Sequence, residues 1–141
     1  MTLTLDMARK LADACLDKGR ALGLNPLTVA VVDAGGHLVA LLREDVTSPM
    51  RPDIAQGKAK GAVAMGAGSR TLFDRAQAQP YFIQSMNALA GGMLVPVPGG
   101  VLIRQEGRII GALGVTGDTS DNDEACAVHA IESLGLSADP G

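Results

Sequence analysis

One stretch of the sequence, Gly114–Ala130, gathers residue types that could do chemistry. It reads GVTGDTSDNDEACAVHA, with four carboxylates within seven positions and a histidine five residues after the last: Asp118, Asp121, Asp123, Glu124 and His129. Carboxylates and imidazoles can bind ligands or transfer protons. Carboxylates in the first turn of a helix also stabilise that helix, because its unpaired N–H groups favour negative charge. We expect mainly a helix start capped by Ser120 or Asp121. One wall of a ligand pocket is the alternative.

The same stretch does not predict a metal centre. Read as a calcium loop that starts at Asp118, it has Asp123 at the sixth position, where such loops carry glycine, and His129 at the twelfth, where they carry glutamate. Cys126 and His129 share one helix face, but zinc takes four protein ligands in a structural site.

Cationic residues in the middle of the chain are the candidates for holding an anion. Arg51, Asp53 and Lys58 lie around the expected start of a helix, where a guanidinium and free N–H groups could hold a carboxylate or a haem propionate. A surface salt bridge, or a buried Lys58 paired with Asp123, is the structural alternative.

Glycines and histidines complete the set of candidates. Gly99 and Gly100 precede a strand and would let a ligand approach the backbone, and Gly117 follows a strand end where it could line a pocket. His37 and His129 could each ligate haem iron or act as a general base, although a lone histidine is commonly structural.

Hydrophobic periodicity indicates the elements that must position these groups. An amphipathic helix is expected within residues 2–23, followed by strands at 28–32 and 37–43 joined by the turn DAGG. Three helices should follow, the first an Ala/Gly-rich helix from about Ile54 to Gly68. Strands are expected at 93–97, 101–105 and 108–115, then a helix to about Leu134, with the last residues forming a tail. Hairpin-linked strands with packed helices predict an α+β domain with an antiparallel sheet.

Composition limits the classes of function. The 141 residues fit one domain, and 47% of them are hydrophobic, enough for a core. A net charge of −3, few aromatic side chains and no basic stripe argue against nucleic-acid binding. The apolar runs are too short for a membrane span, and no signal pattern begins the chain, so we expect a cytoplasmic protein. Cys15 and Cys126 are expected to be reduced thiols in the core.

Three blocks of sequence together resemble a known family. VAVVDAGGHLVALLRED, DIAQGKAKGA and PVPGGVLIRQEGRIIGALGVTGDTSDNDEACA are similar, in order and spacing, to the GlcG/HbpS family of haem-binding and haem-degrading-type domains, which also form the C-terminal part of some PduO-type proteins. The resemblance covers about residues 3–135. It implies a profilin-like fold with a five-stranded antiparallel sheet, a homo-oligomer, and haem as a cofactor.

Two functions follow from the resemblance and the candidate residues. The first is an accessory protein of a catabolic pathway that binds haem or another small carboxylated anion through Arg51, Asp53, Lys58, Gly99, Gly100, Gly117 and His37. The second is a cofactor-independent isomerase, tautomerase or lyase, in which Arg51 orients a carboxylate and Lys58, Asp123 and His129 handle protons. A purely structural subunit, built on the Ala/Gly-rich helix, is a third hypothesis.

Overall fold

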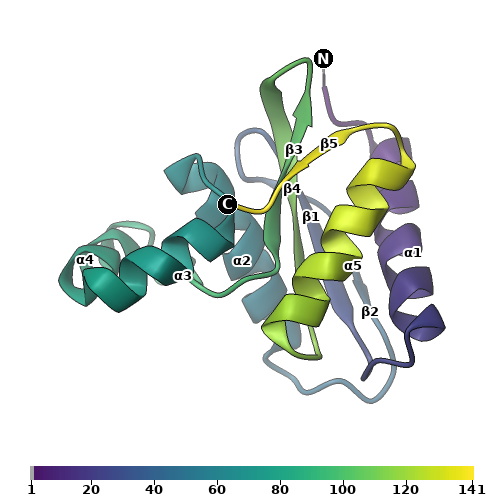
Figure 1. Ribbon diagram of the computed structural model, residues 1–141, viewed down its shortest axis with the longest axis horizontal. Helices are drawn as coiled ribbons and strands as arrows, with labels where there is room; N and C mark the ends of the chain where they lie inside the picture. Colours follow the sequence, from purple (N-terminus) through teal and green to yellow (C-terminus); the bar gives the residue numbers. More distant parts are fainter. Residues whose placement is uncertain (1) are drawn as a thin grey trace.

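The structure, a computed structural model, describes residues 2–141 as one five-stranded sheet with helices on both faces (Figure 1). The elements in chain order are α1 (Leu5–Ala21), β1 (Thr28–Asp33), β2 (Leu38–Arg43), α2 (Arg51–Met65), α3 (Ser69–Ala78), α4 (Pro80–Leu89), β3 (Gly100–Gln105), β4 (Arg108–Thr116), α5 (Ser120–Ser133) and β5 (Ser137–Asp139).

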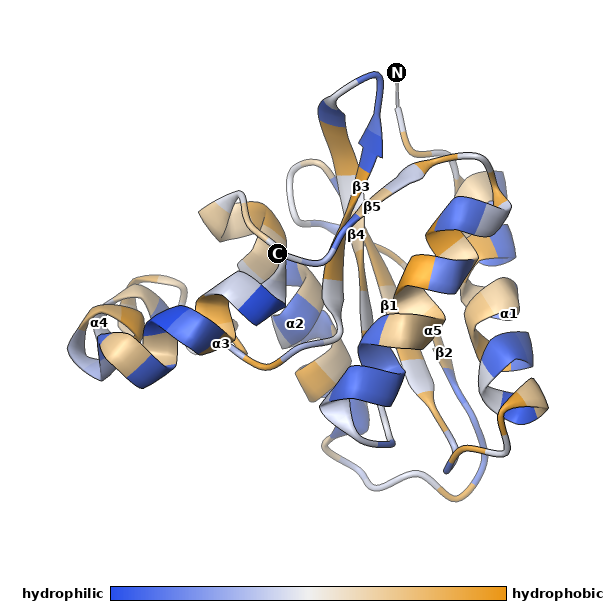
Figure 2. Cartoon of the chain, viewed as in Figure 1, coloured by the Kyte–Doolittle hydropathy of each residue, from blue (hydrophilic) through white to orange (hydrophobic). Residues whose placement is uncertain are grey.

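The sheet is antiparallel throughout, with strand order β2-β1-β4-β3-β5. Helices α1 and α5 lie side by side against one face, and α2 packs on β1, β4 and β3 from the other (Figure 1). This is the α+β fold with a five-stranded antiparallel sheet that the sequence predicts. Hydrophobic residues concentrate along the strands, whereas hydrophilic ones cover much of the outward side of α5 (Figure 2).

The first helix begins and ends as the sequence indicates. Thr4 is its N-cap, and the Thr4 hydroxyl oxygen accepts a hydrogen bond from the Met7 N–H at 3.1 Å. Gly23 follows the helix with a φ of 67°, a conformation that glycine adopts without strain. The buried face of α1 includes Cys15, which is free, as is the buried Cys126 of α5. Both cysteines are therefore core thiols, as expected.

Small residues let α2 approach the sheet closely. A Cβ added to Gly114 of β4 would overlap the carbonyl oxygen of Ala55 in α2, and one added to Gly57 of α2 would overlap the Val95 side chain. Replacing Gly114 would force helix and sheet apart, and replacing Gly57 would push α2 away from the segment that contains Val95. The Ala/Gly content of this helix thus serves packing within the chain.

The expected strand at 93–97 is wrong, and the fifth strand comes from the expected tail. Residues 93–97 run without strand structure beside α2, where the Val95 N–H donates to the Gly57 carbonyl oxygen at 3.2 Å. Pro96 and Pro98 remove donors that a ladder would need. Ser137–Asp139 pairs with β3 instead, and the Arg104 Nε donates to the Asp139 carboxylate at 2.8 Å.

Helices α3 and α4 form an arm that extends away from the sheet (Figure 1). Its small core consists of Leu72, Ile83 and Leu94. Helix α4 carries no charged residue, and its Tyr81 and Leu89 side chains are exposed. No helix within residues 2–141 combines the length and the apolar character needed to cross a membrane.

Candidate functional site

Every carboxylate of the acidic stretch has a partner within the chain. Asp121 and Glu124 both pair with Arg70 of α3. Asp118 accepts hydrogen bonds from the Asn25 N–H at 3.0 Å and from the Asn122 side chain at 2.7 Å. The stretch therefore joins α5 to the arm and to the loop before β1.

The cap of α5 is Thr119, and the expectation of Ser120 or Asp121 was wrong by one or two residues. The Thr119 hydroxyl oxygen accepts a hydrogen bond from the Asn122 N–H at 3.2 Å, which is the usual N-cap geometry. The sequence offers three adjacent residues able to cap, so only the observed backbone turn decides among them.

Lys58 and Asp123 form an ion pair that is sealed from solvent. The Lys58 ammonium lies 3.2 Å from the Asp123 carboxylate and donates to the Val115 carbonyl oxygen at 2.9 Å. The other Asp123 oxygen accepts the Asp118 N–H at 3.0 Å. The two side chains are 3% and 2% exposed. The pair links α2, on one face of the sheet, to α5, on the other.

Burial shifts both pKa values of this pair towards the neutral forms. It lowers the pKa of Lys58 and raises the pKa of Asp123, and the charge of each partner opposes the shift of the other. Nearby Cys126 and Cys15 are also desolvated, which raises the pKa of Cys126 to about 11 and keeps both thiols protonated at neutral pH.

The glycine turn before β3 packs directly on Lys58. A Cβ at Gly99 would lie 2.9 Å from the Lys58 Nζ, and one at Gly100 would overlap the Lys58 carbonyl oxygen. Gly99 and Gly100 are themselves buried. The middle helix and the glycine turn thus meet, but in close packing that leaves no room for a ligand.

Arg51, in contrast, lines an open cleft of about 280 Å³ together with Gly117. Its guanidinium donates to the Thr116 hydroxyl at 2.7 Å and forms no ion pair with residues 2–141. Asp53 is exposed on α2 and does not line this cleft. Gly117 has a φ of 142°, and a Cβ there would overlap the Pro26 carbonyl oxygen, so the turn requires glycine.

His37 lies in the turn from β1 to β2, at the end of β1 that is remote from the Arg51 cleft. Its side chain is 81% exposed, and its Nδ1 is 3.3 Å from the Asp33 carboxylate. Hydrogen bonds from the backbone N–H groups of His37 and Gly35 hold the pKa of Asp33 below its ordinary value. An ionised Asp33 orients the imidazole with Nε2 directed away from it.

Two clefts flank this turn and meet at Gly35. One, of about 230 Å³, is lined by His37 and the apolar side chains of Leu3 and Ile110. The other, of about 340 Å³, is lined by Val63, Met93 and Lys60. Lys60 is half-buried and forms no ion pair within residues 2–141. Neither Lys60 nor Asp33 was predicted from the sequence, although the spacing Asp-x-x-x-His across a turn could have indicated Asp33.

His129 is exposed in a shallow groove between α1 and α5, beside Lys18. It lies six residues from Asp123 on α5, about 120° away around the helix, so the two side chains point to different sides. The structure therefore brings Lys58 to Asp123 and does not bring His129 to either. No group of three or more His, Cys, Asp or Glu side chains in residues 2–141 is placed to hold a metal ion.

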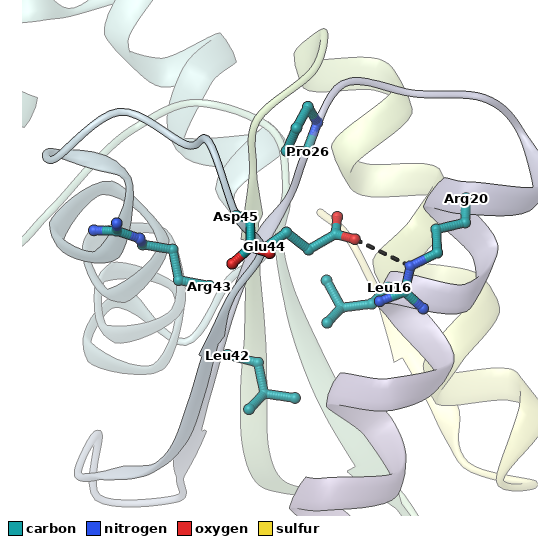
Figure 3. A pocket seen from close by; sticks show the side chains of 7 residues that line it. All are labelled: Leu16, Arg20, Pro26, Leu42, Arg43, Glu44 and Asp45. Carbon is teal, nitrogen blue, oxygen red and sulfur yellow. Dashed lines mark ion pairs between the residues drawn. The ribbon is translucent and has the colours of Figure 1, made fainter.

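A larger cleft, of about 460 Å³, lies between α1 and the end of β2 (Figure 3). Its Arg20 pairs with Glu44 at 3.2 Å, and Glu44 also accepts the Leu27 N–H at 2.8 Å. The charges that face this cleft thus largely neutralise each other. Its other charged residues, Arg43 and Asp45, are of opposite sign and exposed, whereas Arg51 is half-buried.

The chain belongs to the family described as haem degrading protein HbpS-like, which matches residues 3–132. This membership confirms the GlcG/HbpS resemblance noted in the sequence.

Three relatives illustrate the family. An uncharacterized 15.0 kDa protein in the dhaT-dhaS intergenic region of Citrobacter freundii is 33% identical over 134 residues, which are 93% of this chain and 91% of that protein. Protein GlcG of Escherichia coli strain K12 is 35% identical over 94 residues, 64% of this chain and 63% of that protein. A crystal structure of a PduOC:heme complex superposes with a TM-score of 0.87 at 26% identity, covering 97% of this chain and 98% of the other.

Proposed function

We propose that this protein binds haem over the β1–β2 turn, with His37 as the iron ligand. The observation that carries the proposal is the orientation of His37: an exposed imidazole whose Nδ1 faces an ionised Asp33. Histidines that bind metals commonly donate their second N–H to a carboxylate, which fixes the ring and leaves Nε2 for the metal. Within residues 2–141, no carboxylate pairs with His129.

The surroundings of His37 fit the chemistry of haem. The porphyrin plane is apolar and carries two carboxylates. The turn offers half-buried apolar side chains at Val63 and Met93 on one side, and on the other side the cleft reaches the buried Leu3 and Ile110. Lys60 is available to pair with a propionate. When bound, haem supplies an iron centre, and the residues of this chain hold and orient it. Membership of an HbpS-like family and the likeness to a haem complex support the same ligand.

A hemin titration followed by absorption spectroscopy tests this proposal. We expect a stoichiometric Soret shift in the native protein and in His129→Ala. His37→Ala should lose the low-spin histidine signature in electron paramagnetic resonance and bind at least about tenfold more weakly. A native protein that gives no saturable shift, or a His37→Ala variant with an unchanged spectrum and affinity, would refute the assignment.

We also propose that copies of the chain associate and cover the haem. The clefts at the turn are shallow, and the neighbouring Leu38 on the edge strand β2 is exposed. The uncharged α4 adds exposed apolar surface at Tyr81 and Leu89. Light scattering should give a mass above that of the 14.4 kDa chain. A monomer with full hemin affinity would contradict this. A cytoplasmic location and a role in catabolism remain predictions from the sequence.

No observation favours the alternative activity as an isomerase, tautomerase or lyase. That activity would require Lys58 and Asp123 to reach a substrate, and both are sealed. It remains a prediction, to be tested by turnover assays with keto and hydroxy acids.

A further inference from the structure

We propose that the cleft beside Arg51 is a second binding site, for a small monocarboxylate that also carries a hydroxyl or keto group. This goes beyond the haem proposal. The cleft lies at the start of α2, whereas Lys60 lies nine residues further along the same helix. At a rise of 1.5 Å per residue the two positions are about 13–14 Å apart along the axis. A small acid therefore cannot contact both.

The Arg51 guanidinium is oriented and still has unused donors. One Nη holds the Thr116 hydroxyl at 2.7 Å, and Thr116 is buried at the end of β4. The guanidinium makes no other hydrogen bond and no ion pair with residues 2–141. A guanidinium has five N–H donors in a planar fork that matches a carboxylate. A half-buried cation without a counter-ion favours an anion of single charge.

The other walls of the cleft supply polar groups for a second functional group. Ser48 and Asn25 have side chains that make no hydrogen bond within residues 2–141. The Thr47 hydroxyl donates to the Glu44 carbonyl oxygen at 3.2 Å and can still accept. Hydroxyl and amide groups recognise a hydroxyl or a keto oxygen, and a volume of about 280 Å³ suits a molecule of a few carbons.

The loop that forms the mouth of the cleft is strained at Val46. Its φ is 67°, a conformation in which a β-branched side chain is an outlier, and the residue is 94% exposed. Such strain persists where the surrounding structure requires it, and it is common at ligand sites. Val46 thus places an apolar side chain at the entrance, next to the polar interior.

Isothermal titration of the full chain with three matched compounds tests the site. Lactate has the carboxylate and the hydroxyl, propionate lacks the hydroxyl, and lactamide lacks the charge. We expect lactate to bind, propionate to bind about three- to tenfold more weakly, and lactamide not to bind measurably. Arg51→Ala should weaken lactate binding at least about tenfold, while the control Arg43→Ala, an exposed arginine, should leave it unchanged.

A second variant keeps the proposal falsifiable if Arg51→Ala fails to fold. Ser48→Ala retains the guanidinium and should reduce the difference between lactate and propionate. Absence of lactate binding to the native protein, equal binding of lactamide, or equal binding to a folded Arg51→Ala would overturn the proposal. Lactate should also leave the hemin titration unchanged. Displacement of hemin by lactate would overturn the claim that the two sites are separate, without bearing on His37.

Discussion

Lys58 and Arg51 are both cations of helix α2, seven residues and about two turns apart, yet their surroundings differ completely. Lys58 is 3% exposed and bound to Asp123 and to the Val115 carbonyl oxygen. Arg51 lines an open cleft, and its guanidinium hydrogen-bonds only to the Thr116 hydroxyl within residues 2–141. Gly99 and Gly100 pack over Lys58, whereas Gly117 lies against Pro26 and lines the same cleft as Arg51.

This contrast separates residues that hold the protein together from residues that can bind a ligand. Burying an ion pair costs free energy of desolvation. The attraction between the two charges offsets this cost only when their hydrogen bonds are complete, as they nearly are at Lys58. A half-exposed arginine without a counter-ion costs less free energy of desolvation than the sealed pair, and it remains available to an anion. Substitutions at these positions should therefore change the free energy of unfolding by different amounts.

Removing one member of the sealed pair should have the largest effect. Asp123→Ala leaves the Lys58 ammonium buried without its partner, and we expect the free energy of unfolding to fall by about 3–5 kcal/mol. Chemical denaturation would measure the change. A loss below about 1 kcal/mol would mean that the pair opens to solvent.

A substitution in the glycine turn before β3 should have the next largest effect on stability. In Gly100→Ala the new methyl group overlaps the Lys58 carbonyl oxygen, which is backbone and cannot rotate away. Overpacking of this kind costs about 1–3 kcal/mol. The midpoint of urea unfolding reports it, and an unchanged midpoint would show that α2 moves away from β3 easily.

Arg51→Ala should reduce the free energy of unfolding by less than either of these substitutions. It removes one hydrogen bond, to Thr116, and we expect a loss of about 0.5–1.5 kcal/mol in the free energy of unfolding. A much larger loss would place Arg51 with Lys58 among the structural residues and would weaken the case for an open site.

Val46→Gly should increase stability slightly. Glycine adopts a φ near 67° without penalty, which relieves about 1 kcal/mol or more of strain, and the greater freedom of glycine in the unfolded chain offsets part of this gain. Thermal unfolding measures the difference. A clear loss of stability would show that the Val46 side chain contributes contacts despite its exposure.

Low pH should weaken the hydrogen bonds that the Asp118 carboxylate accepts, and so lower its contribution to stability. Hydrogen bonds from the Asn122 side chain and the Asn25 backbone N–H lower the pKa of Asp118 in the folded protein. Its contribution is therefore present above about pH 4, the unfolded value, and is lost as the pH falls through the lower folded pKa. The stability difference between native protein and Asp118→Asn should shrink on going from pH 7 to pH 3. A difference that is constant with pH would contradict this.

The sequence predicted the elements better than the contacts between them. Periodicity and turn residues located α1, α2, β1 and β4, because each has a local signal in apolar spacing, caps or glycines. The strand at 93–97 was wrong and β5 was overlooked, because three residues acquire strand structure only by pairing with β3, which no local pattern reports.

The sequence identified candidate residues by their type, but it could not predict their accessibility. Lys58 and Arg51 look alike in sequence, and they are distinguished by long-range contacts: Asp123, Gly99 and Gly100 enclose Lys58. His37 and His129 likewise differ by a single neighbour, Asp33, and Lys60 becomes relevant only when α2 is placed against the β1–β2 turn.

A hemin titration of the double variant Lys58→Met/Asp123→Leu tests the account most directly. Replacing a buried ion pair with apolar residues of similar size commonly preserves the fold. We predict that the folded double variant keeps the hemin affinity and spectrum of the native protein, because its ligand-binding residues lie elsewhere. Loss of hemin binding by a folded double variant would show instead that the sealed pair belongs to the haem site.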